Sequence, residues 1–382
     1  MQREVIVVGA GPGGATAAIL LAQKGYDVLL LDRSTFPRDK VCGDAVPGRA
    51  LDLLAALGMG EKIRAAGFYP LTMLRLVSPR GYVMDAPMRG ADSAFPSVVV
   101  PRLAFDAILQ QHAVATGAEF LQAQVQAPLL EDGRVAGVRA RVGNEVRELR
   151  SPLVICADGS TSTIARALRP ADKQGRHRAV AIRAYCTELE LLPHHAEFYL
   201  YEEILPGYAW IFPLGAGEAN IGVGMRLDTF REGKHNLQEI LERFLQMPAI
   251  RERLGAGFQL ENVASWQLNL GSEQGVQRAY DGALLVGDAA SLINPLTGGG
   301  IGNAVNSGWL AALVAHEAFL KGDFSRQTLG VYDRYCTSSM WPAMRTAAWM
   351  QQAMALFPGG VDWIVKRAQH ESAFTRMFMT KL

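Results

Sequence analysis

A short run near the N-terminus has the residue types and spacing of a dinucleotide-binding turn. The pattern GxGxxG is met by Gly9-Ala10-Gly11-Pro12-Gly13-Gly14, which separates an apolar stretch from a helical one. Gly9 would permit the tight turn, Gly11 would let the backbone approach a pyrophosphate, and Gly14 would allow close helix packing. Asp32 ends the next apolar stretch and could accept hydrogen bonds from an unphosphorylated ribose. The pattern predicts a site for FAD or NAD without distinguishing them.

A second constellation, far along the chain, favours FAD. The apolar stretch Leu284-Leu285-Val286 is followed by Gly287 and Asp288, and Asp288 could bind a ribityl hydroxyl. Free N–H groups at a glycine-rich helix start can hold anionic and polar groups. The residues expected at that helix start are Pro295, Gly298, Gly299, Gly300 and Ile301.

Aromatic and sulfur-containing side chains could complete a reactive surface. Tyr208, Trp210 and Phe212 alternate along a predicted strand, so they would share one face as a surface for flavin or apolar substrate, or as sheet core. Cys42 lies in a glycine-flanked loop and is either at the flavin face or a small buried hydrophobe. The histidines show no HxxxH or HExxH spacing and the cysteines form no CxxC, so no metal is indicated.

Hydrophobic periodicity gives the elements that must position these residues. A βαβ unit is expected from strand 4–8, helix 13–24 and strand 27–32. The following segments are expected as helix 48–66, a hairpin over 72–86, helix 102–116, and strands 118–126, 134–142, 145–150 and 153–157. From 176 to 270 the period is two, with a helix only at 236–254, and the chain beyond 300 is helical.

The predicted fold class is therefore α/β, with a discontinuous Rossmann-type FAD-binding domain, an inserted antiparallel β-sheet substrate domain and a C-terminal helical region. The FAD-binding domain is assigned to 1–70, 98–175 and 275–325. The β-rich domain is assigned to 71–97 and 176–274, and the helical region to 326–382. Helical spacing of Trp349, Met350, Ala353, Met354 and Phe357 predicts a helix packed on the protein, or alternatively an apolar lip for a membrane or lipid chain.

Composition excludes several classes of protein. The 38 Lys and Arg residues against 37 Asp and Glu residues leave a net charge of +1, which argues against a nucleic-acid partner. With 49% hydrophobic and 20% charged residues, the chain is not intrinsically disordered. Four scattered cysteines and no apolar leader favour a cytoplasmic protein, with peripheral membrane contact as an option. The oligomeric state is left open.

The order of these segments resembles the flavoprotein superfamily that includes p-hydroxybenzoate hydroxylase, in which three motifs enclose one FAD. Here Asp158-Gly159 resembles the internal DG segment and Gly287-Asp288 the GD segment, while Arg102 matches an arginine that heads a helix beside the cofactor. Two further stretches are similar to the geranylgeranyl reductase family, and the resemblance covers residues 1 to about 310. These stretches are 38–44 and 206–213, the latter followed by 219–224.

This resemblance implies an FAD site that also includes Arg33, Lys40, Cys42, Gly43 and Asp44. It implies catalytic roles for Cys42, Tyr208 and Trp210, and substrate binding by Tyr208, Trp210 and Phe212. Many reductases of the family have a glutamate where this chain has Gly299, so the resemblance supplies no proton donor.

The implied activity is reduction of carbon-carbon double bonds in an isoprenoid or similar apolar lipid, by hydride transfer from reduced flavin. NAD(P)H or another reductant, such as an electron-donor protein, would reduce the flavin. The alternatives are a flavin-dependent monooxygenase or halogenase, and an FAD-containing electron-transfer or lipid-binding protein. Related halogenases usually carry a GES-like segment where Cys42-Gly43-Asp44 stands here, which favours the reductase.

Overall fold

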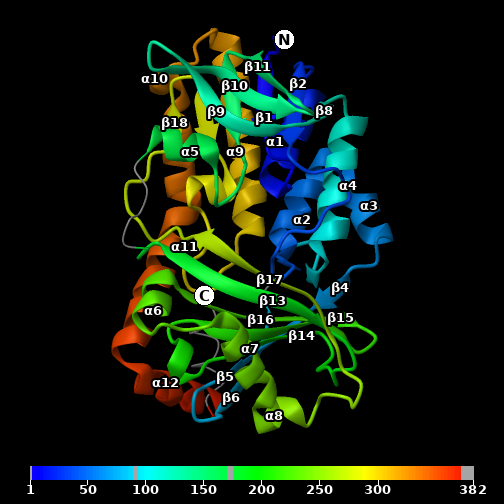
Figure 1. Ribbon diagram of the computed structural model, residues 1–382, viewed down its shortest axis with the longest axis vertical. Helices are drawn as coiled ribbons and strands as arrows, with labels where there is room; N and C mark the ends of the chain where they lie inside the picture. Colours follow the sequence, from blue (N-terminus) through cyan, green and yellow to red (C-terminus); the bar gives the residue numbers. More distant parts are fainter. Residues whose placement is uncertain (1, 89–92, 170–174, 371–382) are drawn as a thin grey trace.

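The computed structural model describes residues 2–88, 93–169 and 175–370, and a six-stranded sheet forms the centre of one half (Figure 1). Its order is β18-β19-β12-β1-β2-β8, and all neighbours are parallel except β18 and β19. The strands are β1 (Val5–Val8), β2 (Val28–Asp32), β8 (Glu119–Gln122), β12 (Leu153–Cys156), β18 (Ala279–Tyr280) and β19 (Ala283–Leu285). Central strands β1, β2 and β12 are buried at every residue, as expected for parallel strands covered on both faces.

Helices and a small sheet cover this central sheet. One side carries α1 (Pro12–Gln23), α4 (Arg102–Ala115) and α9 (Ile301–Lys321), and the other carries the antiparallel strands β9 (Gln124–Glu131), β10 (Arg134–Val142) and β11 (Glu145–Arg150) (Figure 1). Helices α1 and α9 touch through glycines, because a Cβ on Gly308 would lie 2.1 Å from the carbonyl oxygen of Gly13. This contact brings the start of α9 close to the glycine loop before α1.

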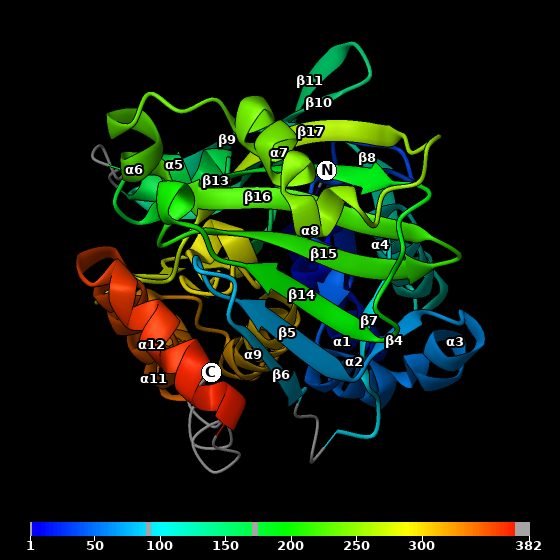
Figure 2. The ribbon, with the colours of Figure 1, turned by 90° about the horizontal axis from the view of Figure 1, so that it is seen from below.

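A seven-stranded sheet forms the second half of the molecule, in the order β17-β13-β16-β15-β14-β5-β6. Its strands are β5 (Met73–Val77), β6 (Val83–Pro87), β13 (Arg178–Cys186), β14 (His195–Tyr199), β15 (Tyr208–Gly215), β16 (Glu218–Arg226) and β17 (Leu260–Asn269). The neighbours are antiparallel except β14 and β5, which run parallel. Figure 2 shows α7 (Leu237–Gln246) and α8 (Pro248–Arg251) over one face. The opposite face turns toward the nucleotide-binding half.

Three predicted elements differ from the structure. The helix expected over 48–66 is three segments, α2 (Gly48–Leu54), a π-helical turn (Ala55–Met59) and α3 (Gly60–Ala65), because Gly58 has a φ of 86°. The strand expected over 118–126 is divided between β8 and β9, which belong to different sheets. The helix expected over 236–254 ends at Gln246, and α8 follows as a separate turn. The expectation of a single helix between 176 and 270 was wrong, because α6 (Leu227–Glu232) follows β16 directly. The alternation of apolar residues continues from one strand into the next, so it cannot show that the chain has passed from one sheet to another.

A small sheet was not predicted at all. It consists of β3 (Ala45–Val46), β4 (Tyr69–Leu71) and β7 (Ser97–Val99), with β7 in the middle. Strands this short show no recognisable alternation of apolar and polar residues, because each contributes only one or two inward side chains. The sheet holds the chain directly after the Cys42 segment, because the backbone N–H of Val100 donates to the carbonyl of Asp44 at 3.0 Å.

The last described part of the chain, up to His370, forms helices α10 (Arg326–Leu329), α11 (Val331–Leu356) and α12 (Pro358–His370), and the last two lie beside β5 and β6 (Figure 2). Buried Asp362 fixes α12 by accepting hydrogen bonds from the Ser78 hydroxyl at 2.6 Å and the Arg80 backbone N–H at 2.9 Å. Residues 371–382 of the expected helical region lie outside the described residues, and the domain boundaries stay a prediction. Within the described ranges, no helix combines the length and apolar character that a membrane crossing requires.

Candidate functional site

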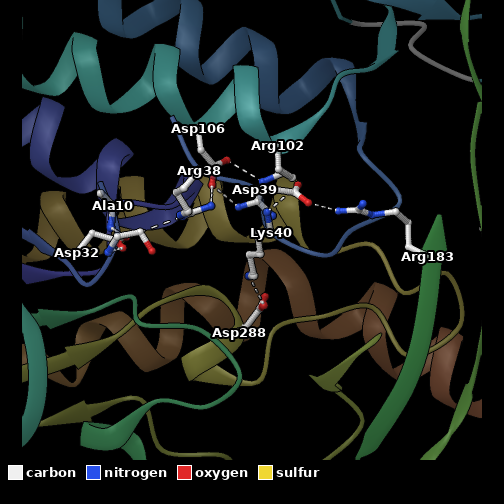
Figure 3. Close-up of polar contacts among 10 residues, drawn as sticks. Ala10, Asp32, Arg38, Asp39, Lys40, Arg102, Asp106, Arg183 and Asp288 are labelled. Atoms are coloured by element: carbon white, nitrogen blue, oxygen red, sulfur yellow. Dashed lines mark hydrogen bonds and ion pairs between the residues drawn. The ribbon is translucent and has the colours of Figure 1, made fainter. Parts of the chain in front are cut away.

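The glycine loop between β1 and α1 is shaped by backbone contacts that no side chain could share. Gly9 has a φ of 98°, and a Cβ there would lie 2.3 Å from the carbonyl oxygen of Ala157. A Cβ on Gly14 would lie 1.8 Å from the carbonyl oxygen of Gly9. Asp32 closes the loop by accepting a hydrogen bond from the Ala10 N–H at 2.9 Å (Figure 3). The backbone at Gly9 and Gly14 therefore leaves no room for a side chain, which is what the predicted tight turn and close packing require.

Cationic side chains surround the approach to this loop. A Cβ on Gly11 would lie 3.7 Å from a guanidinium nitrogen of Arg102 and 3.7 Å from one of Arg38. Both arginines donate to Asp106 at 2.6 Å, and Arg102 does so twice (Figure 3). Burial alone would lower the pKa of Arg102, but the fully buried Asp106 carboxylate raises it, so Arg102 stays charged. Asp106 and Asp32, whose Oδ2 lies 3.8 Å from Arg38, balance the charge of the two arginines. The guanidinium groups beside the loop still suit hydrogen bonds to a pyrophosphate.

Sequence reasoning did not include Arg38 or Asp106 among the site residues. Arg38 precedes the Cys42 segment, and Asp106 lies one helical turn after Arg102 in α4. An i,i+4 pair of opposite charges at a helix start was the available signal. By contrast, Arg33, which was predicted to bind cofactor, is an exposed residue directly after Asp32.

The DG segment, the GD segment and the start of α9 meet around Asp288. Its Oδ2 accepts hydrogen bonds from Lys40 Nζ at 3.1 Å and from the Ser160 hydroxyl at 3.3 Å. A Cβ on Gly300, the residue before α9, would lie 3.3 Å from Asp288 Oδ1. Burial by itself would raise the pKa of Asp288, but the Lys40 ammonium brings it below its usual value. Asp288 is therefore an ionised acceptor at the place where a ribityl chain was expected.

The remaining predicted cofactor residues line the same region. Gly159 has a φ of 80°, and a Cβ there would lie 3.9 Å from Lys40 Nζ. Asp158 accepts a hydrogen bond from the Thr163 N–H through Oδ2, while its buried Oδ1 has no partner among the described residues. Gly287 donates its N–H to the Ser307 hydroxyl at 3.0 Å. A buried acceptor without a donor fits a bound group that supplies hydroxyls.

The loop before α9 is held from both sides. Gly298 has a φ of 63°, Gly299 is exposed, and α9 begins at buried Ile301. The carbonyl of buried Pro295 accepts a hydrogen bond from Gln351 of α11 at 2.5 Å. We call the following residues, together with this loop, the cofactor cradle: Gly9–Gly14, Asp32, Arg38, Lys40, Arg102, Asp158, Gly159, Gly287 and Asp288.

The Cys42 segment is tied to the seven-stranded sheet by Asn220. The Asn220 amide donates to the Cys42 carbonyl and to Asp44 Oδ2, both at 2.8 Å, and its oxygen accepts from Trp210 Nε1 at 2.9 Å. The Tyr185 hydroxyl also donates to Asp44 Oδ2, at 2.7 Å. Burial raises the pKa of Asp44 to about 6, although the donors Tyr185 and Asn220 oppose that shift. Within the described chain, Asp44 Oδ1 is buried without a hydrogen-bond partner.

A second link joins the two halves next to this segment. Arg183 of β13 is fully buried and donates to Asp39 Oδ2 at 2.6 Å (Figure 3). Neither residue was predicted, because a lone arginine in a strand carries no motif. The segment that carries Cys42 lies between the cradle and the inserted sheet, because Asp39, the Cys42 carbonyl and Asp44 all bond to residues of that sheet. The Cys42 side chain is half-buried there. Burial raises the pKa of the Cys42 thiol, so it stays protonated at neutral pH.

The three aromatic residues of β15 share one face, as their alternation predicted. The Trp210 indole lies across β16, because a Cβ on Gly222 would sit 2.3 Å from its ring. Trp210 and Phe212 are only 6% and 7% exposed and pack with Leu71 and Val99 as part of a core cluster. Tyr208 differs, because it lines a cavity and its hydroxyl donates to the carbonyl of Thr297.

That cavity has a volume of about 310 Å³ and lies between β5, β14 and β15 on one side and α11 and α12 on the other. Its wall is almost entirely apolar, and it includes Met350, Ala353 and Met354 of α11 and Phe357 directly after that helix, whose spacing was noted in the sequence. Tyr208 and Thr297 belong both to this wall and to the hydrogen bond at the loop before α9. The apolar cavity and the cofactor cradle therefore adjoin.

A parallel nucleotide-binding sheet with a glycine loop, faced by an inserted sheet, defines the two-domain flavoprotein class. The chain matches the FAD-binding domain family over residues 2–347. It is 31% identical to the digeranylgeranylglycerophospholipid reductase of Thermoplasma volcanium, over 87% of this chain and 82% of the relative. It is 35% identical to the menaquinone reductase of Mycobacterium tuberculosis, over 81% and 75% of the two chains.

Solved structures agree with this grouping. A geranylgeranyl bacteriochlorophyll reductase-like protein of Thermoplasma acidophilum superposes with a TM-score of 0.83 at 26% identity, covering 97% of this chain and 92% of the other. A flavin-dependent brominase gives a TM-score of 0.81 at 19% identity, covering 100% and 93%, which shows the shared fold alone. The chain belongs to the geranylgeranyl reductase family of FAD-dependent oxidoreductases.

Proposed function

We propose that this oxidoreductase saturates carbon-carbon double bonds in the isoprenoid chain of a lipid. The observation that carries the proposal is the apolar cavity of about 310 Å³ that adjoins the cofactor cradle. An unactivated alkene offers almost no hydrogen-bonding group, so it must be recognised by shape and apolar contact. A halogenase or monooxygenase acting on a polar aromatic substrate would need several polar groups in the cavity wall. In this wall the polar side chains are mainly those of Tyr208 and Thr297.

The cofactor cradle would hold FAD along its length. Gly11 and the arginines Arg38 and Arg102 suit the pyrophosphate, and Asp32 suits the adenosine ribose. Asp288 and the unpartnered Oδ1 of Asp158 suit hydroxyls of the ribityl chain. When bound and reduced by the external donor, the flavin would supply a hydride for one alkene carbon and return to oxidised FAD. The N-terminus of α9 would contribute partial positive charge at the end of the cradle nearest the cavity.

Residues of this chain would position the alkene and exclude water. Tyr208 is fixed by its hydrogen bond to Thr297, so its ring forms a rigid wall between cavity and cradle. Adding two hydrogens to one double bond requires a proton as well as the hydride, and Gly299 carries no acid. The Cys42 thiol keeps its proton because burial raises its pKa, and it lies on the segment beside the cradle. We assign Cys42 as the candidate proton donor, with water as the alternative.

The names of the relatives agree with a lipid substrate, since digeranylgeranylglycerophospholipid and menaquinone both carry isoprenoid chains. The electrons would come from NAD(P)H or another reductant, such as an electron-donor protein. We expect the protein to act in the cytoplasm at the surface of the membrane that contains its lipid.

Anaerobic single-turnover measurement tests this function. The FAD-loaded protein is reduced chemically, so that the identity of the natural donor does not matter, and either lipid is added in detergent. We expect flavin reoxidation together with product that has gained two hydrogens for each double bond reduced. A flavin that stays reduced until O2 is admitted, and then oxygenates or halogenates an added substrate, would assign the protein to the monooxygenase class. Repeating the reduction with NADH and NADPH identifies the donor.

A further inference from the structure

Exposed apolar side chains surround one end of the apolar cavity. Trp349 and Phe357 line the cavity and yet are 68% and 71% exposed, and neighbouring Leu356 is 73% exposed. We call Trp349, Leu356 and Phe357 the rim. Large side chains of this kind are rarely left in water together without a binding partner. A further aromatic residue, Trp363 of α12, is 58% exposed.

The exposed charges that residues 340–370 contribute beside the rim have one sign. Arg345 lies one helical turn before Trp349 on the same exposed face of α11, and Lys366 and Arg367 are exposed on α12. The single acidic residue between 340 and 370 is Asp362, which is buried and bonded to Ser78 and Arg80. The exposed charge of this part of the chain is therefore cationic, although the whole protein carries a net charge of only +1.

We propose that the rim and its neighbouring cations dock on the surface of a bilayer that contains anionic lipids. Aromatic and aliphatic side chains bordered by Lys and Arg suit the boundary between acyl chains and phosphate headgroups. The cations complement the negative surface potential of such a membrane. Because Trp349 and Phe357 of the rim also line the cavity, docking there lets an isoprenoid chain pass from the bilayer into the cavity without crossing water. This inference rests on the proposed function, because only a lipid substrate explains why a membrane-docking rim should adjoin the cavity.

Vesicle flotation of the full-length FAD-loaded protein tests the docking. Phosphatidylcholine vesicles with and without phosphatidylglycerol serve as probes, at low and high salt. We expect strong flotation only with phosphatidylglycerol and weaker flotation at high salt. A triple variant with Arg345→Gln, Lys366→Gln and Arg367→Gln should lose about tenfold to a hundredfold in partitioning, since each cation near an anionic surface adds favourable energy. Leu356→Ser, which is exposed and outside the cavity wall, should lose about fivefold.

A control variant carries the same change in net charge at the far end of the molecule. Arg139→Gln, Arg147→Gln and Arg150→Gln remove three exposed cations from β10 and β11, and should leave flotation unchanged. Equal losses from the two triple variants would overturn the docking surface, as would absence of flotation for the parent protein. Flotation that appears only after deletion of residues 371–382 would show that the chain itself covers the rim, and would also overturn the proposal.

Activity measurements separate this inference from the proposed function. With lipid delivered in detergent, the triple variant at 345, 366 and 367 should match the parent, whereas with lipid delivered in anionic vesicles its rate should fall about tenfold or more. Equal rates in vesicles would contradict the docking role. A parent protein that floats with vesicles but reduces no double bond in detergent would refute the proposed function and leave the docking supported.

Discussion

The cofactor cradle and the apolar cavity adjoin, yet they achieve recognition by opposite means. The cradle is defined by backbone contacts at Gly9 and Gly14 and by charged side chains held at hydrogen-bond distance. The cavity is defined by the volumes of side chains from three adjacent strands of one sheet and from two helices. Backbone geometry tolerates almost no substitution, whereas an apolar wall accepts many combinations of similar volume. The two regions should therefore respond very differently to comparable mutations.

The largest effect is expected for Gly9→Ala in the cradle. A methyl group there would lie 2.3 Å from the Ala157 carbonyl oxygen, and the φ of 98° is unfavourable for any L-residue. We expect loss of retained FAD and destabilisation of about 4 kcal/mol or more. Flavin absorbance relative to protein absorbance, together with the thermal unfolding midpoint, measures both effects.

Gly25→Ala is the matched control, because Gly25 also has a positive φ, 86°, but has nothing within 4 Å of its would-be Cβ. It should keep its FAD and lose only about 1 kcal/mol, the cost of a left-handed conformation for alanine. If both variants retain flavin equally, steric exclusion at the cradle does not decide cofactor binding.

The next effect concerns Asp44, which lies between the cradle and the seven-stranded sheet and bonds to Tyr185 and Asn220. Burial raises its pKa to about 6 in the folded protein, against 3.8 for an unperturbed aspartate. Between these pH values the folded state binds the proton more tightly than the unfolded state, so this group's contribution to stability falls as pH rises from about 4 to 6. The full cost above pH 6 is on the order of 3 kcal/mol. Asp44→Asn should remove that pH-dependent cost.

Chemical unfolding of the FAD-free protein across this pH range measures the difference between parent and Asp44→Asn. The variant should gain stability relative to the parent as pH rises, and parallel curves would contradict the expectation. Asp85→Asn provides a control of opposite sign. A hydrogen bond from Arg75 lowers the pKa of Asp85, so its stabilising contribution is present above its unfolded pKa and is lost as pH falls.

The third prediction addresses the cavity by filling it. Ala353→Trp places an indole inside the apolar wall, whereas Ala355→Trp places one on the exposed side of the same helix. The first change should lower kcat/KM for lipid by about tenfold to a hundredfold, because an indole in the cavity would take the place of about two or three methylene groups of the lipid chain. The second should leave it unchanged. Both variants should retain FAD, and equal kinetics for the two would show that the lipid chain binds elsewhere.

The same contrast explains how much could be predicted from the sequence. Gly9, Gly14 and Asp288 were predicted because backbone approach and charge at a strand end restrict the residue type to very few choices. The face of α11 that lines the cavity was visible as a helical period, but its opposite wall on β5 and β14 was not. The sequence of an apolar strand does not indicate which distant helix will pack against it.

Ion pairs between segments were hidden for a related reason. Arg183 and Asp39 are single charges in separate segments, and their pairing depends on how the two halves pack. Trp210 was assigned to substrate or cofactor contact, with sheet core as the alternative, and that role stays a prediction. Trp210 is buried over Gly222, whereas Tyr208 is an aromatic residue of β15 that lines the cavity. The alternation of aromatic residues along β15 predicted that they share one face, but it could not show which of them lines the cavity.

The smallest effect is expected for Cys42→Ala, which tests the boundary between the two regions. The thiol is half-buried and protonated, and its segment is held by Asn220 through the backbone carbonyl, which the substitution leaves in place. FAD content should therefore stay as in the parent, while reoxidation of reduced flavin by lipid slows about tenfold. Cys186→Ala makes the same chemical change in the core of the inserted sheet and should leave that rate unchanged. An unaltered rate in Cys42→Ala would assign proton delivery to water, whereas loss of FAD would assign Cys42 to the cradle instead.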